Sequence, residues 1–252
     1  MNNKITVITV TLNCRDLAIE TAKSVLSQTS QEYEYVIKDG GSTDGTVESL
    51  RSMGLEVFVM ADTGIYDAMN QAIGLASGDY LYFLNAGDTF FDDRVLEKVI
   101  IDINDDASIY YCDICLLPMN IITNYPPVIT KYYLFRKNIN HQACFISRRL
   151  YIALGKFKVE YKFNADQYIL RDAIINHNEI SKKLNVVVSR WSYGGVSTRK
   201  SNRKIQSKER WRMIKDFYSW NERLIYGMRS FYFMNFAKAF IWDLKYNKIL
   251  NK

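Results

Sequence analysis

Three short polar motifs carry the side chains best suited to binding a ligand. Thr11-Leu12-Asn13, Asp39-Gly40-Gly41 and Asn85-Ala86-Gly87-Asp88 each follow a run of apolar or β-branched residues. A carboxylate such as Asp39 can accept a hydrogen bond from a ring N–H, and the glycines beside it let the backbone approach a ligand closely. The motifs predict one shared polar site. The alternative is that each motif is an ordinary turn.

A regular alternation of strands and helices would bring these motifs together. Alternating or β-branched residues predict strands at 4–11, 33–39, 55–60 and 80–85. Apolar residues at helical spacing predict helices at 16–27, 46–52, 65–76 and 93–102. This alternation predicts an α/β protein with a parallel, doubly wound sheet, which binds ligands at the carboxyl ends of its strands. All three motifs fall at that edge.

The second half of the chain is less regular. Its patterns predict strands at 108–116, 128–135, 142–147 and 184–190, and a helix at 165–177. From residue 201 onward, Trp, Tyr and Phe recur at helical spacing among Lys and Arg. We expect these tail helices to pack on the domain, to form a homodimer, or to lie against an anionic membrane surface.

The composition is that of a protein with a substantial core. The chain has 252 residues, of which 48% are hydrophobic, and this suits one large domain with a tail or two small domains. It has no apolar run of about 18 residues and no secretory signal at its start, so we expect a cytoplasmic protein, either free or peripheral at the inner face of the membrane. The net charge is +6, with Lys and Arg concentrated from Arg199 onward. This charge predicts an anionic partner surface, and we expect no nucleic-acid partner.

The four cysteines do not predict a metal or redox site. Cys14, Cys112, Cys115 and Cys144 are expected to be reduced in a cytoplasmic chain of this size. Cys112 and Cys115 form a single CxxC inside a predicted strand, where residues three apart face opposite sides. A structural role is therefore favoured for this pair.

Four motifs together resemble glycosyltransferase family 2. They are TVITVTLN, IKDGGSTDGT, DTGIYDAMNQAIGLASGDYLYFLNAGD and NHQACFISRR. The resemblance covers about the first 200 residues and is greatest to the branch that builds bacterial capsule, O-antigen and exopolysaccharide. It implies the GT-A fold, a Rossmann-like, mostly parallel mixed sheet flanked by helices. Residues 1–200 would form the catalytic domain, with a nucleotide-sugar-binding half at 1–100, an acceptor half at 101–200, and a basic aromatic helical tail at 201–252.

The resemblance assigns a nucleotide-sugar donor, preferably a UDP-sugar, to the polar motifs. Asp39 would contact the nucleobase. The implied donor-binding residues are Thr9, Thr11, Asn13, Asp39, Asp44, Asp62, Gly64, Asn70, Asn85, Ala86 and Gly87. Ordinary strand alternation explains Thr9 equally well, and helix capping explains Asp62 equally well.

The Asn85–Asp88 motif occupies the place of the family's DxD metal motif. The resemblance implies that Asp88 binds Mn²⁺ or Mg²⁺, which would neutralise the two donor phosphates. This sequence departs from the common pattern because Asn85 replaces the first acidic residue. The departure puts the metal affinity in question, and the alternative is a simple turn after the strand.

Asp166 matches the position of the family's catalytic carboxylate, at the start of a predicted helix in the second half. Inverting transfer needs one base to take a proton from the acceptor hydroxyl. A helix N-cap is the alternative role, and Asp172 is the other candidate base. His141 and Gln142 match the acceptor side of the family's pocket.

A glycine-rich segment near residue 195 resembles a loop of the same branch. It could close over the diphosphate as a lid, followed by basic residues that pair with phosphates. The residues implied are Gly194, Gly195, Ser197 and Arg199. A solvated basic loop is the alternative.

The expected activity is inverting transfer of a sugar to a hydroxyl of a glycan or polyprenyl-linked glycan in surface polysaccharide biosynthesis. Two alternatives stay open. A nucleotidyltransferase that makes nucleotide sugars would need a glycine-rich loop after the first strand, and TLNCRDLAIE has no glycine. A non-catalytic protein that binds nucleotide sugars would not need both Asp88 and Asp166.

Overall fold

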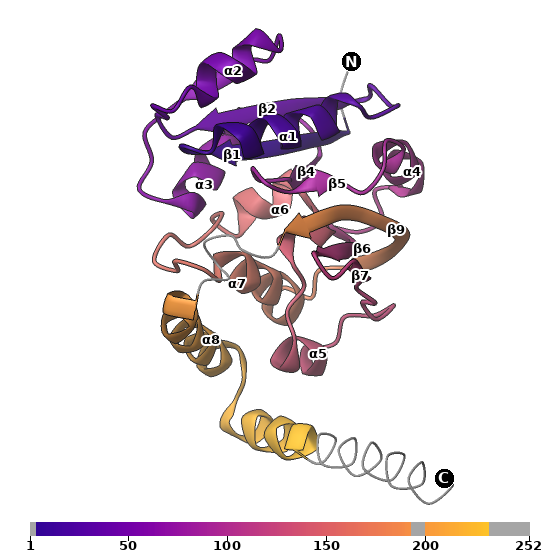
Figure 1. The fold of residues 1–252 in the computed structure, drawn as a ribbon. Coiled ribbons are helices and arrows are strands. Elements are labelled where there is room, and N and C mark those ends of the chain that lie inside the picture. Colours follow the sequence, from indigo (N-terminus) through magenta and orange to yellow (C-terminus); the bar gives the residue numbers. More distant parts are fainter. Residues whose placement is uncertain (1–3, 193–199, 232–252) are drawn as a thin grey trace, which may run out of the picture.

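A computed structural model describes residues 4–192 and 200–231 (Figure 1). The strands are β1 (Ile5–Thr11), β2 (Tyr33–Asp39), β3 (Val57–Val59), β4 (Tyr80–Phe83), β5 (Thr89–Phe90), β6 (Ile109–Leu117), β7 (Ile121–Ile122), β8 (Cys144–Ser147) and β9 (Ser181–Ser192). The helices are α1 (Arg15–Leu26), α2 (Thr46–Ser52), α3 (Ile65–Leu75), α4 (Val95–Asp102), α5 (Lys131–Arg136), α6 (Arg148–Ala153), α7 (Ala165–Arg171) and α8 (Arg203–Phe217). The described strands form one sheet in the order β3-β2-β1-β4-β8-β6-β9-β5, with β7 paired to β6.

The first half of the sheet is parallel, as the sequence predicts. β1 runs parallel to β2 and β4, and β2 runs parallel to β3. All seven residues of β1 are buried, as expected for a central strand covered on both faces. Thr11 pairs with Asp39, and Ile8 pairs with Phe83. The carboxyl ends of β1, β2 and β4 therefore meet at one edge of the sheet.

The second half of the sheet is mixed. β8 runs antiparallel to both β4 and β6, whereas β9 runs parallel to β6. Tyr82 near the end of β4 pairs with Phe145 near the start of β8. Because β8 returns in the opposite direction, the short 3-10 turn His141–Ala143 that precedes it lies beside the carboxyl end of β4. The second half of the chain thus meets the first half at this edge.

The strand predicted at 128–135 is wrong, because this segment forms helix α5. The Thr130 side chain accepts a hydrogen bond from the Tyr133 backbone N–H at 3.0 Å, which caps the helix. Leu134 then turns inward and is fully buried. The aromatic residues that suggested a strand instead serve packing around this single helical turn.

Helix α8 packs against α7 through apolar side chains. Met213 and Phe217 are 1% and 5% exposed, and the Phe217 ring lies 4.8 Å from that of Tyr168 on α7. A further helix begins at residue 220 and runs through 231, the last residue described before the chain end. Figure 1 shows both helices at the end of the molecule away from β1 and β2. In the described ranges, no helix has the length and apolar character needed to cross a bilayer.

The cysteines have structural roles. All four are free, and Cys112, Cys115 and Cys144 are buried. Burial raises the pKa of the Cys112 thiol well above its ordinary value, so this thiol stays protonated and unreactive.

Candidate active site

Two neighbouring residues connect the two carboxylates that the sequence singles out. Gln142 donates a hydrogen bond from Nε2 to Oδ2 of Asp88 at 2.9 Å. His141 Nδ1 lies 3.2 Å from Oδ2 of Asp166. Asp88 follows β4 and Asp166 lies in the first turn of α7, so the segment before β8 brings together residues from three distant parts of the chain.

His141 also contacts the first residue of the Asn85–Asp88 motif. The Asn85 side-chain amide nitrogen lies 3.3 Å from His141 Nε2. When Asn85 donates to Nε2, the ring proton is placed on Nδ1, which donates to Asp166. The hydrogen-bond partners thus assign the tautomer of His141. The His141 side chain is 18% exposed, so one part of the ring faces the open side of the site.

Asp166 is held as a buried anion by several donors. Tyr66 donates to Oδ1 at 3.0 Å, and Gln167 donates to Oδ2 at 3.2 Å. Burial acts to raise the pKa of Asp166, but the hydrogen bonds from His141, Tyr66 and Gln167 lower the pKa overall. The carboxylate is therefore ionised at neutral pH, as a base must be before it accepts a proton. Burial and the nearby Asp166 in turn raise the pKa of Tyr66 well above its usual value, so Tyr66 remains a donor.

The turn from Asn85 to Asp88 offers oxygen atoms that suit a divalent cation. Within the described residues, the buried side-chain oxygen of Asn85 has no hydrogen-bond partner. An orphaned amide oxygen beside a carboxylate fits the oxygen ligands of Mg²⁺ or Mn²⁺, which complete their coordination with substrate phosphates and water. The described part of the chain has no group of three or more His, Cys, Asp or Glu that could hold a metal by itself. A cation here would depend on the donor.

Thr21 on α1 fixes the shape of this turn. Its hydroxyl donates to the Asp88 carbonyl at 2.7 Å and accepts from the Gly87 N–H at 3.0 Å. Gly87 has a φ of +98°, which a residue with a Cβ rarely adopts. Thr21 is fully buried in the middle of a predicted helix, and its place in the apolar pattern did not reveal this contact.

Asp39 organises the loop that follows β2. Its Oδ1 accepts from the backbone N–H groups of Gly41 and Ser42 at 2.8 and 2.6 Å, and its Oδ2 accepts from the Ser42 hydroxyl at 2.6 Å. The Asp39 side chain is fully buried. Oδ2 has a lone pair left for a nucleobase N–H, but a base would reach it only after the loop shifts.

The same loop is linked to the start of α1. Asn13 accepts from the Thr43 N–H at 2.8 Å, and its own N–H donates to the Ser42 hydroxyl at 2.8 Å. The Thr11 hydroxyl at the end of β1 lies 2.9 Å from the sulfur of Cys14, the N-cap residue of α1. Thr11 at the end of β1 and Asn13 after it thus lie beside the loop that follows β2.

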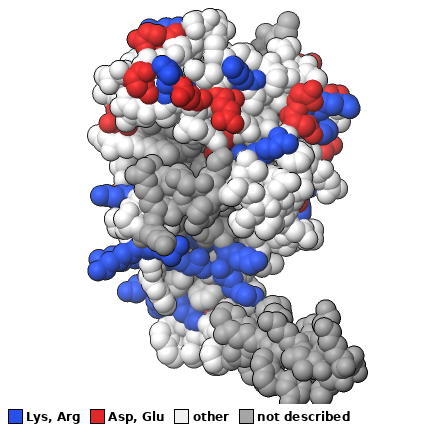
Figure 2. All heavy atoms as spheres, viewed as in Figure 1, with Lys and Arg blue, Asp and Glu red and all other residues white. Residues whose placement is uncertain are grey.

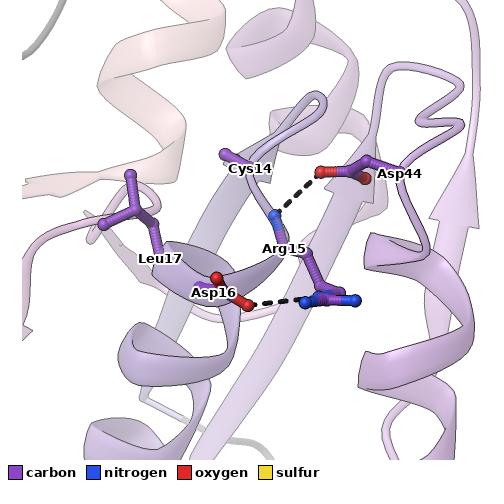
Figure 3. A pocket seen from close by; sticks show the side chains of 5 residues that line it. All are labelled: Cys14, Arg15, Asp16, Leu17 and Asp44. Carbon is purple, nitrogen blue, oxygen red and sulfur yellow. Dashed lines mark hydrogen bonds and ion pairs between the residues drawn. The ribbon is translucent and has the colours of Figure 1, made fainter.

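Asp44 and the start of α1 line a hollow of about 410 Å³ (Figure 3). The Arg15 N–H donates to Asp44 at 3.0 Å, and the Arg15 side chain turns toward Asp16. Leu17 also lines the hollow, and a Cβ added at Gly87 would lie 3.7 Å from it. The hollow therefore lies beside the Asn85–Asp88 turn, on its α1 side. Its lining residues Arg15, Asp16 and Leu17 were not identified from the sequence.

Three expected donor-binding residues have their side chains in structural contacts. The Thr9 hydroxyl is buried and donates to the Leu84 carbonyl at 2.8 Å. Asn70 exchanges two hydrogen bonds of 2.8 Å with the backbone of Phe157. Asp62 forms a buried ion pair with Lys38.

Asp62 also contacts the chain at two glycine positions, Gly40 and Gly64. It accepts from the N–H of Gly64, which precedes α3 and has a φ of +147°, at 3.1 Å. A Cβ at Gly40 would lie 2.7 Å from Oδ2 of Asp62, so only glycine fits there. Asp62 does not cap α3, whose N-cap residue is Gly64 and has no side-chain cap bond; Asp62 instead pairs with Lys38 and accepts from the Gly64 N–H.

The remaining predicted residues are Asp172, Ala86 and the four expected lid residues. Asp172 lies at the end of α7, where it bonds Asn176 at 2.8 Å. The expected lid residues Gly194, Gly195, Ser197 and Arg199 lie outside the described residues. Ala86 occupies the turn between Asn85 and Gly87 and packs near the cluster under α1 and α2.

Solved structures of glycosyltransferases share this fold. TarS of S. aureus in complex with UDP-GlcNAc superposes with a TM-score of 0.62 at 18% identity, over 75% of this chain and 58% of that chain. The mannosyltransferase PcManGT from Pyrobaculum calidifontis, in complex with GDP-Man and Mn²⁺, gives a TM-score of 0.63 at 18% identity, over 82% and 62% of the two chains. The predicted GT-A fold is confirmed by these similarities.

A curated relative is more similar in sequence. The PGL/p-HBAD biosynthesis glycosyltransferase of Mycobacterium bovis is 30% identical over 200 residues, which are 76% of this chain and 78% of that protein. Residues 6–152 match the family model described as "Glycosyl transferase family 2". This chain is a glycosyltransferase and belongs to glycosyl transferase family 2.

Proposed function

We propose that this glycosyltransferase moves a sugar from a nucleoside-diphosphate donor, preferably a UDP-sugar, to a hydroxyl of a glycan, with inversion at the anomeric carbon. One observation carries the proposal. His141 and Gln142, adjacent in sequence, each contact one of two carboxylates that have different tasks in this chemistry. Such a link fixes the base relative to the phosphate-binding turn, and reactions of this kind depend on that geometry.

The donor diphosphate would lie against the Asn85–Asp88 turn. Asp88 and the unpartnered Asn85 oxygen would hold the cation. A bound Mn²⁺ or Mg²⁺ would neutralise the charge that develops on the leaving nucleoside diphosphate. The loop shaped by Asp39 and Asp44 would receive the nucleoside, next to the hollow at the start of α1.

Asp166 would act as the base. Its carboxylate takes the proton of the acceptor hydroxyl while that oxygen attacks the anomeric carbon from the face opposite the leaving group. An α-linked donor would then give a β-linked product. His141, Tyr66 and Gln167 keep Asp166 ionised and oriented.

The acceptor in this proposal is a lipid-linked glycan at an anionic membrane surface, as in surface polysaccharide biosynthesis. The helix at 220–231 contacts α5 through Tyr226, whose ring lies 5.5 Å from that of Phe135. Its other side exposes apolar residues that recur at helical spacing. They are Trp220, Leu224, Ile225, Met228 and Phe231. Lys and Arg side chains gather over neighbouring α8 (Figure 2), which suits anionic lipid headgroups.

A donor screen tests the enzymatic part of the proposal. The protein is incubated with Mn²⁺ and a set of UDP-, GDP- and dTDP-sugars, and the released nucleoside diphosphate is measured. We expect turnover with one donor class, loss of Mn²⁺-dependent donor binding in Asp88→Ala, and normal binding in Asp93→Ala, which removes an exposed carboxylate nearby. Unchanged Mn²⁺-dependent binding by Asp88→Ala would remove Asp88 from the metal site.

Vesicle sedimentation tests the membrane part. We expect the wild type to bind vesicles rich in phosphatidylglycerol, and the double variant Leu224→Glu/Met228→Glu to lose this binding. Ile101→Glu is the matched control, because Ile101 is 75% exposed on α4. Equal vesicle binding by all three proteins would show that the helix at 220–231 does not bind the membrane. A concentration-dependent dimer that the double variant disrupts would instead show that a second copy covers this face.

A further inference from the structure

A carboxylate of α8 is bonded to the segment that leads into α7. Glu209 accepts hydrogen bonds from the backbone N–H of Lys162 at 2.6 Å and of Phe163 at 3.2 Å. It also accepts from the side-chain amide of Asn164 at 2.8 Å. Glu209 is only 9% exposed, so water cannot readily replace these donors. Three consecutive residues before the helix of Asp166 are thus held by one side chain.

This contact replaces the usual cap of a helix. Asn164 is the N-cap residue of α7, and asparagine is among the residues that most often cap a helix with their own side chain. In the described structure Asn164 makes no such cap, and its amide instead points to Glu209 and to the Gln206 carbonyl at 3.5 Å. The entry of the chain into α7 is therefore set by α8 and not by local sequence.

We propose that Glu209 is a positioning residue for Asp166, and this proposal rests on the function proposed above for Asp166. Asp166 lies two residues after Asn164, in the first turn of α7. Its contacts to Tyr66 at 3.0 Å and His141 at 3.2 Å come from other elements, so a shift of the α7 entry moves the carboxylate relative to both. Misplacement of a reacting group by about 1 Å can lower a rate on the order of 100-fold.

Helix α8, at the start of the segment expected to be a tail, would have a specific task. Residues 201–252 were expected to be a tail, and the buried face of α8 contains Glu209 together with Met213 and Phe217. Those apolar contacts bring α8 against α7, and Glu209 adds directional bonds to the α7 entry. The position of the base would thus depend on α8 being docked.

The test compares Glu209→Ala and Glu209→Gln with the control Glu222→Gln, which removes a tail carboxylate that contacts Lys131 and not the 162–164 segment. We first measure the thermal unfolding of each variant. We then measure kcat and donor Kd at a temperature where every variant is folded. For Glu209→Ala we expect kcat to fall about 10- to 100-fold with donor Kd unchanged. Glu209→Gln keeps one acceptor oxygen and should fall less, and Glu222→Gln should retain the wild-type kcat.

A double-variant comparison separates positioning from a general loss of structure. If Glu209 acts through Asp166, Glu209→Ala should have little further effect on the residual rate of Asp166→Asn, because the effects of residues coupled through one hydrogen-bond network are not additive. A kcat for Glu209→Ala equal to the wild type, or rate losses that multiply in the double variant, would overturn the proposal. If Glu209→Ala does not fold, an unchanged kcat in Glu209→Gln overturns it. Near-normal transfer by Asp166→Asn alone would instead reject the proposed base itself.

Discussion

Replacing Gln142 with methionine removes the side-chain donor to Asp88 and little else. The substitution keeps the length of the side chain and loses the 2.9 Å bond from Nε2 to Asp88 Oδ2. The backbone of Gln142 keeps its own partners, because its carbonyl accepts from Tyr82 at 2.8 Å and from Ser189 at 3.2 Å. The variant should therefore fold with the turn before β8 in place.

The structure sets the size of the expected effect. Gln142 is 5% exposed, so water does not take the place of the lost amide. A hydrogen bond to a charged group contributes about 1.5–3 kcal/mol, which corresponds to roughly 10- to 150-fold in an equilibrium constant. Loss of a side chain that orients a metal ligand weakens metal affinity by about 10- to 100-fold. Both arguments therefore predict a loss of Mn²⁺ affinity on the order of 10- to 100-fold.

The assay is a Mn²⁺ titration of sugar transfer at saturating donor. We expect Gln142→Met to need about 10- to 100-fold more Mn²⁺ for half-maximal rate and to recover most of its kcat when Mn²⁺ is saturating. The matched control is Gln28→Met. Gln28 is 3% exposed and bonds the Asp92 carbonyl and the Leu96 N–H, away from the site. A wild-type Mn²⁺ midpoint in Gln142→Met would refute the link between Gln142 and a metal-binding Asp88.

Two further variants test other contacts. Tyr66→Phe removes a hydrogen bond that lowers the pKa of Asp166 against the effect of burial, so the pKa should rise and the acid limb of the kcat/KM profile should move toward neutral pH; an unmoved limb would contradict this. Asn70→Leu leaves two backbone groups of Phe157 without partners and should lower the free energy of unfolding by about 1–3 kcal/mol, measured by urea denaturation, with donor affinity unchanged. Loss of donor binding without loss of stability would show that Asn70 binds the donor.

The parallel half of the fold was predictable because its signals are local. The strands predicted at 4–11 and 33–39 are β1 and β2, and the helix predicted at 65–76 is α3. Each is a run with one clear period, so neighbouring residues suffice to identify it. The motifs that resemble family 2 added the mixed sheet, which depends on pairings between distant strands that no local pattern contains.

The rest required three-dimensional contacts. The run at 128–135 has strand-like aromatic residues, and the deciding feature was the Thr130 cap. The motifs indicated His141 as a site residue but not its contact with Asp166, since the two lie 25 positions apart. The sequence around Thr9 gave no sign that its hydroxyl donates to the carbonyl of Leu84, the residue after β4. In the sequence, nothing distinguishes Glu209 from the other charged residues of a basic tail. Its contacts with residues 162–164 follow only from the packing of α8 against α7.

The division of the chain at residue 200 stays a prediction, as do the donor roles of the loop residues. Asp39 and Asp44 accept hydrogen bonds that shape the loop after β2. Their direct contact with a nucleobase would show as a weaker affinity for the free nucleotide in Asp39→Asn, independent of Mn²⁺.

The most direct test of the central claim is single-turnover sugar transfer by Asp166→Asn, measured beside its donor affinity. Asparagine keeps the size of the side chain and cannot take the acceptor proton. We expect donor Kd to stay close to that of the wild type and the transfer rate to fall about 10²- to 10⁴-fold. A transfer rate close to that of the wild type, with donor bound normally, would show that Asp166 is not the base.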